Sequence, residues 1–169
     1  GLKGHRVAVL ATEGVEQVEL VEPVKALRDA GAEVHLIEPD GKEIQAFNHL
    51  DKGDTFPADK SLADVSEEDY DALFLPGGVA NPDALRMDSD AIEFVQAFFR
   101  AGKPVAAICH APWMLVEADV VKGRKLTSFP SLAHSSSSTS DASSTTRRIW
   151  RTAVFSTSGA RSKRTRSAS

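Results

Sequence analysis

A cysteine and a histidine stand side by side after an apolar run, and this pair is the part of the sequence best suited to covalent chemistry. Residues 105–108 predict a buried strand and the residues after Ala111 predict a helix, so Cys109 occupies a strand-to-helix turn. Such a turn strains the backbone of the nucleophile and needs small residues two positions away, as Ala107 and Ala111 are. The amides and dipole at the helix start favour thiolate over thiol, and His110 can serve as ion-pair partner or proton carrier.

The same residues have a purely structural interpretation, in which Cys109 is an inert core residue and His110 a hydrogen-bonded residue at a helix start. A second motif favours the chemical interpretation. Gly77-Gly78 follows another apolar run, and a loop without side chains lets backbone N–H groups point at a developing oxyanion. A plain tight turn is the alternative for the glycine pair. Because the turn, the histidine and the glycine loop occur together in this sequence, we favour the chemical interpretation of Cys109 over the structural one.

Strand-like and helix-like segments alternate along the first 108 residues. Apolar runs predict strands at 6–11, 34–37, 72–75 and 105–108, helical spacing predicts helices at 20–30 and 90–101, and a short hairpin is predicted around 44–47. This alternation predicts an α/β fold with an open, mostly parallel sheet and helices on both faces, in which sites form beyond the carboxyl ends of the strands. Both motifs lie at such ends.

Five motifs in this sequence resemble those of one known family. They are residues 15–20 (Val-Glu-Gln-Val-Glu-Leu), 75–78 with 82–86, 102–104, 107–112 and 123–128. Together they resemble the PfpI family of intracellular cysteine peptidases, within the ThiJ/PfpI superfamily of relatives of class I glutamine amidotransferases. The likeness runs in order from Arg6 to Leu132, and it implies a flavodoxin-like domain with a Cys-His pair at the turn. One departure is Ala111, where the family often has glycine.

The resemblance also implies two catalytic acids. Glu19 matches an acid on the first helix that contacts the cysteine sulfur, where a buried, protonated carboxyl would hydrogen-bond the thiolate. Asp83 matches an acid that completes the triad of a neighbouring subunit, so we expect a homodimer or a higher homo-oligomer. Asp83 could equally be the N-cap of a short helix after Pro82.

These residues predict an enzyme in which the Cys109 thiolate attacks an electrophilic carbonyl. The backbone amides of Gly78 and His110 would hold the oxyanion, and the His110 ring would move the proton. The resemblance implies peptide bonds or reactive aldehydes and glycated proteins as substrates. We favour glyoxalase or deglycase chemistry, because a thiol hemiacetal needs no strong leaving-group acid.

Two other functions compete with this one. A stress-response protein would use the same cysteine as an oxidant sensor, with holding of unfolded clients as its activity. A glutamine amidotransferase is disfavoured, because no His-x-Glu segment follows Cys109.

Composition limits the cofactors and the location that we expect. The single cysteine excludes an internal disulfide and a cysteine zinc cluster, and the other histidines fall in no ligand spacing, so we expect no metal and no cofactor. No run approaches the roughly 18 apolar residues of a membrane span, and residues 1–5 lead into a strand rather than a signal peptide. A cytoplasmic location is therefore expected.

The chain divides into an acidic part and a basic part. Residues 1–133 carry 13 Lys+Arg against 23 Asp+Glu, a balance of −10, and are predicted to form the PfpI-like α/β domain. Residues 134–169 carry 7 against 1, a balance of +6, and 18 of these 36 positions are Ser or Thr. Few aromatics interrupt the scattered arginines of this tail, so it lacks a strong pattern for binding nucleic acid or a membrane.

The tail also departs from the resemblance. PfpI-like chains continue here with a helix, an acidic stretch, further strands and a closing helix, and none of these is evident in residues 134–169. A shift of reading frame would produce such a break. Residues 144–148 can be written in codons that read Asp-Asp-Glu-Glu in another frame. We therefore predict that the tail is a frame-shift product, largely disordered or poorly packed.

Overall fold

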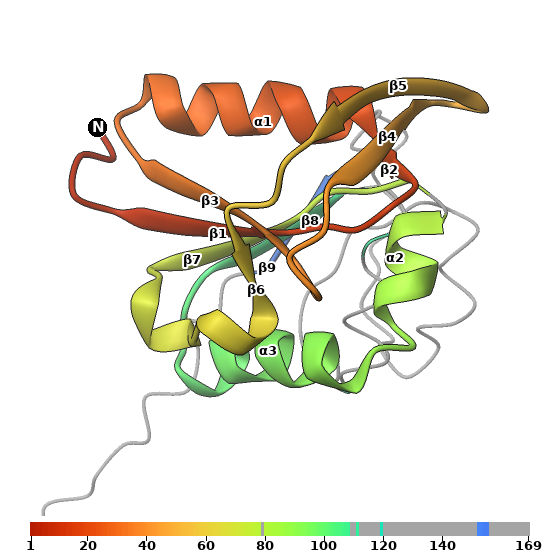
Figure 1. Cartoon of the computed structure of the whole chain (residues 1–169). Coiled ribbons are helices and arrows are strands. Elements are labelled where there is room, and N and C mark those ends of the chain that lie inside the picture. The colour runs from red at the N-terminus through yellow and green to blue at the C-terminus, as the bar shows by residue number, and fades with distance from the viewer. Residues whose placement is uncertain (79, 109–110, 112–118, 120–151, 156–169) are drawn as a thin grey trace, which may run out of the picture.

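In the computed structural model, a central sheet lies between two layers of helices (Figure 1). The structure describes residues 1–78, 80–108, 111, 119 and 152–155. The central sheet has the order β6-β3-β1-β7-β8-β9. Its strands are β1 (Arg6–Leu10), β3 (Glu33–Glu38), β6 (Lys60–Ser61), β7 (Ala72–Leu75), β8 (Val105–Ile108) and β9 (Thr152–Phe155). The helices are α1 (Gln17–Asp29), α2 (Ala80–Leu85) and α3 (Ser89–Arg100), with 3-10 turns at Leu62–Asp64 and Glu67–Asp69.

The order of the strands reverses between β1 and β7. Neighbouring strands of the central sheet run parallel, except β8 and β9, which are antiparallel. From β1 the chain first adds β3 on one side and later adds β7 on the other. Open α/β sheets bind ligands at such a reversal, beyond the carboxyl ends of the strands.

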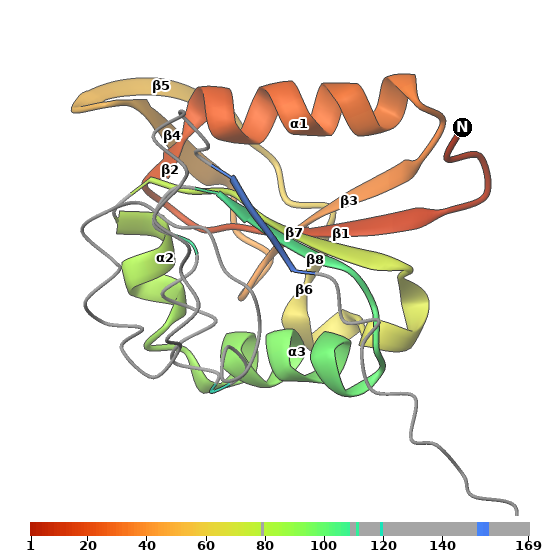
Figure 2. The same ribbon diagram turned by 180° about the vertical axis from the view of Figure 1, so that it is seen from behind.

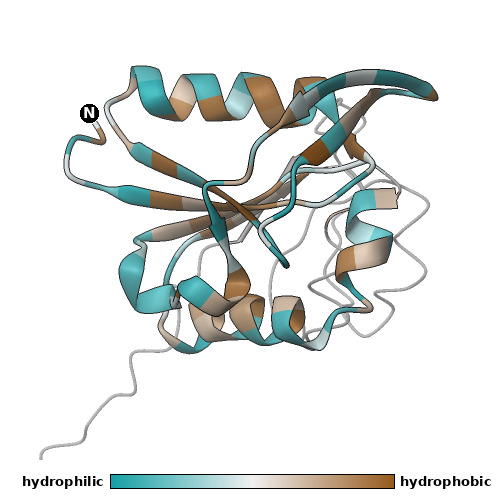
Figure 3. Cartoon of the chain, viewed as in Figure 1, coloured by the Kyte–Doolittle hydropathy of each residue, from teal (hydrophilic) through white to brown (hydrophobic). Residues whose placement is uncertain are grey.

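Alternate residues of the central strands supply two separate cores. In β1, Val7 and Val9 face the core that contains Leu20 of α1, and Ala8 and Leu10 face the core that contains Phe98 of α3. Viewed from either side, α1 and α3 therefore cover opposite faces of the sheet (Figure 2). Because both faces are covered, the central strands β1 and β7 are apolar along most of their length, as the hydropathy colouring shows (Figure 3).

A small second sheet packs beside the start of α1. It consists of β2 (Val15–Glu16), β4 (Ile44–Asn48) and β5 (Asp51–Phe56), in the order β2-β4-β5. Gln17 and Asp54 hold this hairpin to α1 through reciprocal bonds: the Gln17 Nε2 donates to the Asp54 carboxylate at 2.8 Å, and the Asp54 N–H donates to the Gln17 Oε1 at 2.7 Å. The Glu16 carboxylate also accepts the N–H of His49, at 3.1 Å to its nearer oxygen, at the turn of the hairpin.

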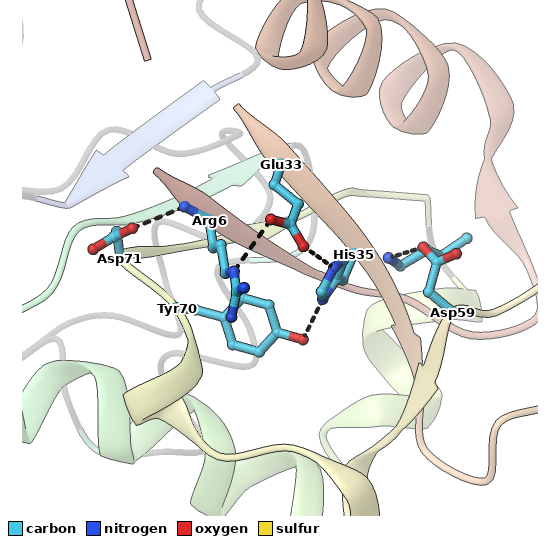
Figure 4. Close-up of polar contacts among 7 residues, drawn as sticks. Arg6, Glu33, His35, Asp59, Tyr70 and Asp71 are labelled. Carbon is cyan, nitrogen blue, oxygen red and sulfur yellow. Dashed lines mark hydrogen bonds and ion pairs between the residues drawn. The ribbon is translucent and has the colours of Figure 1, made fainter. Parts of the chain in front are cut away.

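Polar side chains gather at the amino ends of β1, β3 and β7 (Figure 4). His35 contacts the Glu33 carboxylate at 2.8 Å with Nε2 and the hydroxyl of buried Tyr70 at 3.0 Å with Nδ1, and Arg6 Nε donates to Glu33 at 3.2 Å. Burial raises the pKa of Tyr70 to about 12, and the hydrogen bond with His35 lowers the pKa of Glu33. This cluster therefore lies at the end of the sheet opposite to the carboxyl ends of the strands.

The predicted fold class is confirmed. The structure contains the four predicted strands, the helices predicted at 20–30 and 90–101, and the hairpin, and the central sheet is mostly parallel with helices on both faces. The helix predicted after Ala111 lies outside the described residues. Within the tail, Thr152–Phe155 form β9, and its other residues lie outside the described ones. The domain boundary at residue 133 and the frame shift stay predictions. No helix in the described ranges has the length and apolar character that crossing a membrane requires.

Candidate functional site

The candidate site lies where β7 and β8 end side by side. Leu75 and Ala107 are register partners in this parallel pair, so the glycine loop after β7 and Cys109 after β8 start from the same edge of the sheet. The N–H of buried Ala111 donates to the carbonyl of Ile108 at 3.0 Å, which is the hydrogen bond of a turn. Cys109 and His110 themselves lie outside the described residues, and their roles stay predictions.

The glycine loop requires glycine at its second position. Gly78 has a φ of +93°, in the left-handed region that other residues rarely adopt. A Cβ built there would lie 2.8 Å from the carbonyl oxygen of Gly14 and 2.9 Å from the N–H nitrogen of Glu16, and both of these atoms belong to the backbone. The loop therefore packs directly against the segment that connects β1 to α1.

The same packing brings the first turn of α1 to the glycine loop. The N–H of Glu16, the residue before α1, reaches the carbonyl of Gly77 at 3.4 Å. Glu19 lies in the first helical turn, where the dipole favours a negative charge, and its Oε2 oxygen is buried. The structure thus places Glu19 and Gly78 on adjoining segments of one edge. The contact of Glu19 with the cysteine sulfur stays a prediction.

Asp83 lies on α2, which follows the glycine loop. The helix begins at Ala80, so Asp83 sits inside its first turn, and the alternative interpretation of Asp83 as an N-cap after Pro82 is wrong. The side chain is 54% exposed, and it accepts a hydrogen bond from Arg86 Nε at 2.9 Å. An exposed acid is accessible to a second subunit, and the predicted role in a neighbour's triad stays open.

A series of hydrogen bonds at this end of the sheet, centred on the buried side chain of Asn81, was not predicted from the sequence. Asn81 on α2, 1% exposed, donates through Nδ2 to the carbonyls of Pro76 (2.9 Å) and Gly77 (3.4 Å), and its Oδ1 accepts the N–H of Thr12 (2.7 Å). The Thr12 hydroxyl in turn donates to the buried carboxylate of Glu38 at 3.3 Å. Asn81 gave no signal because Asn-Pro after a glycine loop is typical of an exposed turn.

No group of three or more His, Cys, Asp or Glu side chains suited to a metal ion gathers among the described residues. At this edge the described residues supply backbone amides and the carboxylates of Glu19 and Asp83. A loop with a left-handed glycine, backed by a helix start, is suited to present N–H groups to an anion.

Comparisons with known proteins identify the family. The model of the DJ-1/PfpI family matches residues 5–160. The chain is 41% identical over 128 residues to "Putative cysteine protease YraA" of Bacillus subtilis strain 168, covering 75% of this chain and 73% of that protein. It is 44% identical over 124 residues to "Protein/nucleic acid deglycase 2" of Escherichia coli strain K12, covering 72% of this chain and 69% of that protein. These names support an enzyme.

A solved structure supports the same assignment. A two-domain protein of Anabaena variabilis, with DJ-1/ThiJ/PfpI-like and ferritin-like domains, superposes with a TM-score of 0.71 and 30% identity. The likeness covers 78% of this chain and 37% of that longer one. With the family match over most of its length, the chain belongs to the DJ-1/PfpI family.

Proposed function

We propose that this protein is a cysteine-dependent glyoxalase or deglycase that acts through Cys109 on reactive aldehydes or on the adducts they form with proteins. The observation that carries the proposal is the left-handed Gly78 at the end of β7, beside the strand that leads directly into Cys109. The deglycase name of the Escherichia coli relative supports the substrate class.

The proposed reaction with methylglyoxal balances without an external oxidant. The thiolate of Cys109 adds to the aldehyde carbon, a C–S bond forms, and the carbonyl pair moves to oxygen, where the Gly78 and His110 amides stabilise the charge. Protonation gives a thiol hemiacetal. Transfer of a proton from the former aldehyde carbon to the neighbouring carbonyl carbon, through an enediol, then gives a thioester. Water hydrolyses this thioester to lactate and releases the thiol.

Glu19 and His110 are the residues that we propose transfer protons in this reaction. Glu19 sits on the segment that adjoins the glycine loop, and one of its carboxylate oxygens is buried, as expected for a group that exchanges a proton rather than carrying a solvated charge. His110 follows the nucleophile directly in the chain and is the proposed carrier of the hydroxyl proton. Neither role requires a metal or an organic cofactor.

The proposal is tested by measuring lactate formed from methylglyoxal by the wild type, by Cys109→Ser and by Tyr70→Phe. Tyr70 lies at the opposite edge of the sheet and controls for loss of stability. We expect turnover by the wild type and by Tyr70→Phe, and none by Cys109→Ser. A wild type that cleaves a peptide substrate instead would assign the peptidase alternative. A wild type without turnover, whose only response to peroxide is a sulfinic acid at Cys109, would assign the sensor.

A further inference from the structure

Asn81 is a buried side chain at the candidate site, and both its amide NH₂ group and its amide oxygen form hydrogen bonds. It is one of two buried polar or charged residues in the described ranges, with Glu38. Its amide NH₂ faces two carbonyl oxygens and its amide oxygen faces an N–H group, so the donor and acceptor ends are assigned by their partners. Burying such a side chain is costly unless it is fully paired, and this pairing joins segments that are distant in the chain.

The segments that Asn81 joins are those that flank the reversal of the strand order. Thr12 follows β1, Pro76 follows β7, and Asn81 bonds to both. The Thr12 hydroxyl extends the connection to Glu38 at the end of β3. The ends of three adjacent parallel strands are thus tied together, at the place where this class of sheet binds its ligands.

The contact with the glycine loop fixes the direction of the amide of Gly78. The carbonyl of Gly77 and the N–H of Gly78 belong to one planar, trans peptide unit, so they point in opposite directions. The Gly77 carbonyl is held from the inside by Asn81 Nδ2 and by the N–H of Glu16, each at 3.4 Å. The N–H of Gly78 therefore points away from α2 and α1. Within the part of the chain that the structure describes, no hydrogen bond uses this N–H.

Glycine cannot hold this direction by itself. A residue without Cβ samples both signs of φ, and the peptide plane between two glycines can flip by rotation about the flanking bonds at little steric cost. A loop that must present one N–H group therefore needs partners for its carbonyls. Asn81 supplies them to two successive peptide units, through Pro76 at 2.9 Å and Gly77 at 3.4 Å.

We propose that Asn81 is a positioning residue that orients the Gly77–Gly78 peptide, so that the N–H of Gly78 is presented to the oxyanion formed during attack on a carbonyl substrate. This inference rests on the proposed function, because it assigns a role in that reaction. Asn81 does not touch the reacting atoms. Its effect is transmitted through the Gly77 carbonyl.

Two substitutions separate the donor from the rest of the side chain. Asn81→Ala removes donor and acceptor at every pH. Asn81→Asp keeps the acceptor for the Thr12 N–H but faces the carbonyl of Pro76 with an oxygen, which can donate only when the new carboxyl is protonated. Burial and the facing carbonyl raise the pKa of that carboxyl.

The readout compares two reactions of the same thiol. Attack on methylglyoxal develops an oxyanion, whereas alkylation by iodoacetamide displaces iodide and places no new charge on oxygen. In Asn81→Ala we expect kcat for methylglyoxal to fall about tenfold or more, with KM within about twofold and the alkylation rate of Cys109 unchanged. In Asn81→Asp we expect the ratio of variant to wild-type kcat to fall as the pH rises through the pKa of the new carboxyl.

Tyr70→Phe serves as the matched control, because it removes a buried hydrogen bond at the opposite edge, and its kcat should stay at the wild-type value. If Asn81→Ala does not fold, the pH dependence of Asn81→Asp decides. If the wild type turns over methylglyoxal and the Asn81 variants have the same kcat, this inference is wrong and the proposed function stands. The inference is also wrong if the alkylation rate of Cys109 falls together with kcat. Absence of wild-type turnover removes the proposed function and the inference with it.

Discussion

Substitution of Gly78 by alanine tests directly whether the glycine loop is held by close backbone packing. The substitution forces a side chain into a φ of +93° and places its Cβ 2.8 Å and 2.9 Å from two backbone atoms, closer than real Cβ atoms approach. The left-handed conformation costs about 1–2 kcal/mol. Relief of the two contacts requires a backbone shift, which costs about 1–3 kcal/mol more. We therefore expect Gly78→Ala to lower the free energy of unfolding by about 2–5 kcal/mol.

Two other glycines separate the conformational cost from the packing cost. Gly102, with a φ of +71°, and Gly4, with a φ of +83°, have no atom within 4 Å of a built Cβ. Gly102→Ala and Gly4→Ala should therefore show the conformational cost alone, about 1–2 kcal/mol. The difference between Gly78→Ala and these controls measures the close approach to Gly14 and Glu16.

Urea unfolding followed by circular dichroism measures these free energies in the full chain. In a protein of this length, we expect a fall in Tm of about 10 °C for Gly78→Ala, because each kcal/mol shifts Tm by roughly 2–4 °C. Methylglyoxal turnover should be lost at temperatures where the variant is fully folded, since the shift displaces the Gly78 amide. Equal urea midpoints for Gly78→Ala and Gly102→Ala would refute the packing argument.

Three further predictions concern the acids and the tyrosine. Tyr70, the only tyrosine, should titrate in the folded protein near its raised pKa of about 12, and near its ordinary value of 10.0 in urea, as measured by tyrosinate absorbance. The folded state holds this proton more tightly, so its contribution to the free energy of unfolding is complete below the ordinary pKa and is lost as the pH rises toward 12. In Tyr70→Phe the free energy of unfolding should fall less over this pH range. The same pH dependence in wild type and Tyr70→Phe would contradict the assignment. Glu19→Ala should retain partial turnover with a raised pKa of the Cys109 thiol, measured from the pH dependence of alkylation, and complete inactivity with an unchanged profile would rule out the proposed hydrogen bond. If Asp83 completes a neighbour's site, then Asp83→Asn and Cys109→Ser proteins, each inactive alone, should regain activity on mixing, whereas a monomer in sedimentation with full activity would exclude that role.

The central fold was predictable because its elements carry strong periodic signals. The apolar runs that form β1, β7 and β8 are buried on both faces, and Ile92, Val95 and Phe99 mark one side of α3. The small sheet was only partly predictable. Its strand β5, Asp-Lys-Gly-Asp-Thr-Phe, has almost no apolar alternation, and pairing with β4 and the bonds between Gln17 and Asp54 hold it instead.

The candidate site divides in the same way. Gly78 was predictable, because a glycine pair that follows a buried strand and Pro76 indicates a loop whose backbone needs glycine. The start of α2 was not, because Pro82 and Asp83 imitate the first positions of a helix that in fact begins at Ala80. Asn81 was missed for a related reason: its partners, Thr12 and Pro76, are distant in sequence and contribute backbone groups, which no side-chain pattern reveals.

The two edges of the sheet use buried polar groups in different ways. At the amino ends, the Tyr70 hydroxyl bonds to His35, and His35 bonds to the exposed carboxylate of Glu33, so all the partners are side chains. At the carboxyl ends, the partners of Asn81 are backbone carbonyls and a backbone N–H, so the contacts set the directions of peptide units. Only the second arrangement controls where the N–H of Gly78 points. This is the reason to expect that loss of Asn81 reduces turnover, while loss of the Tyr70 hydroxyl reduces stability alone.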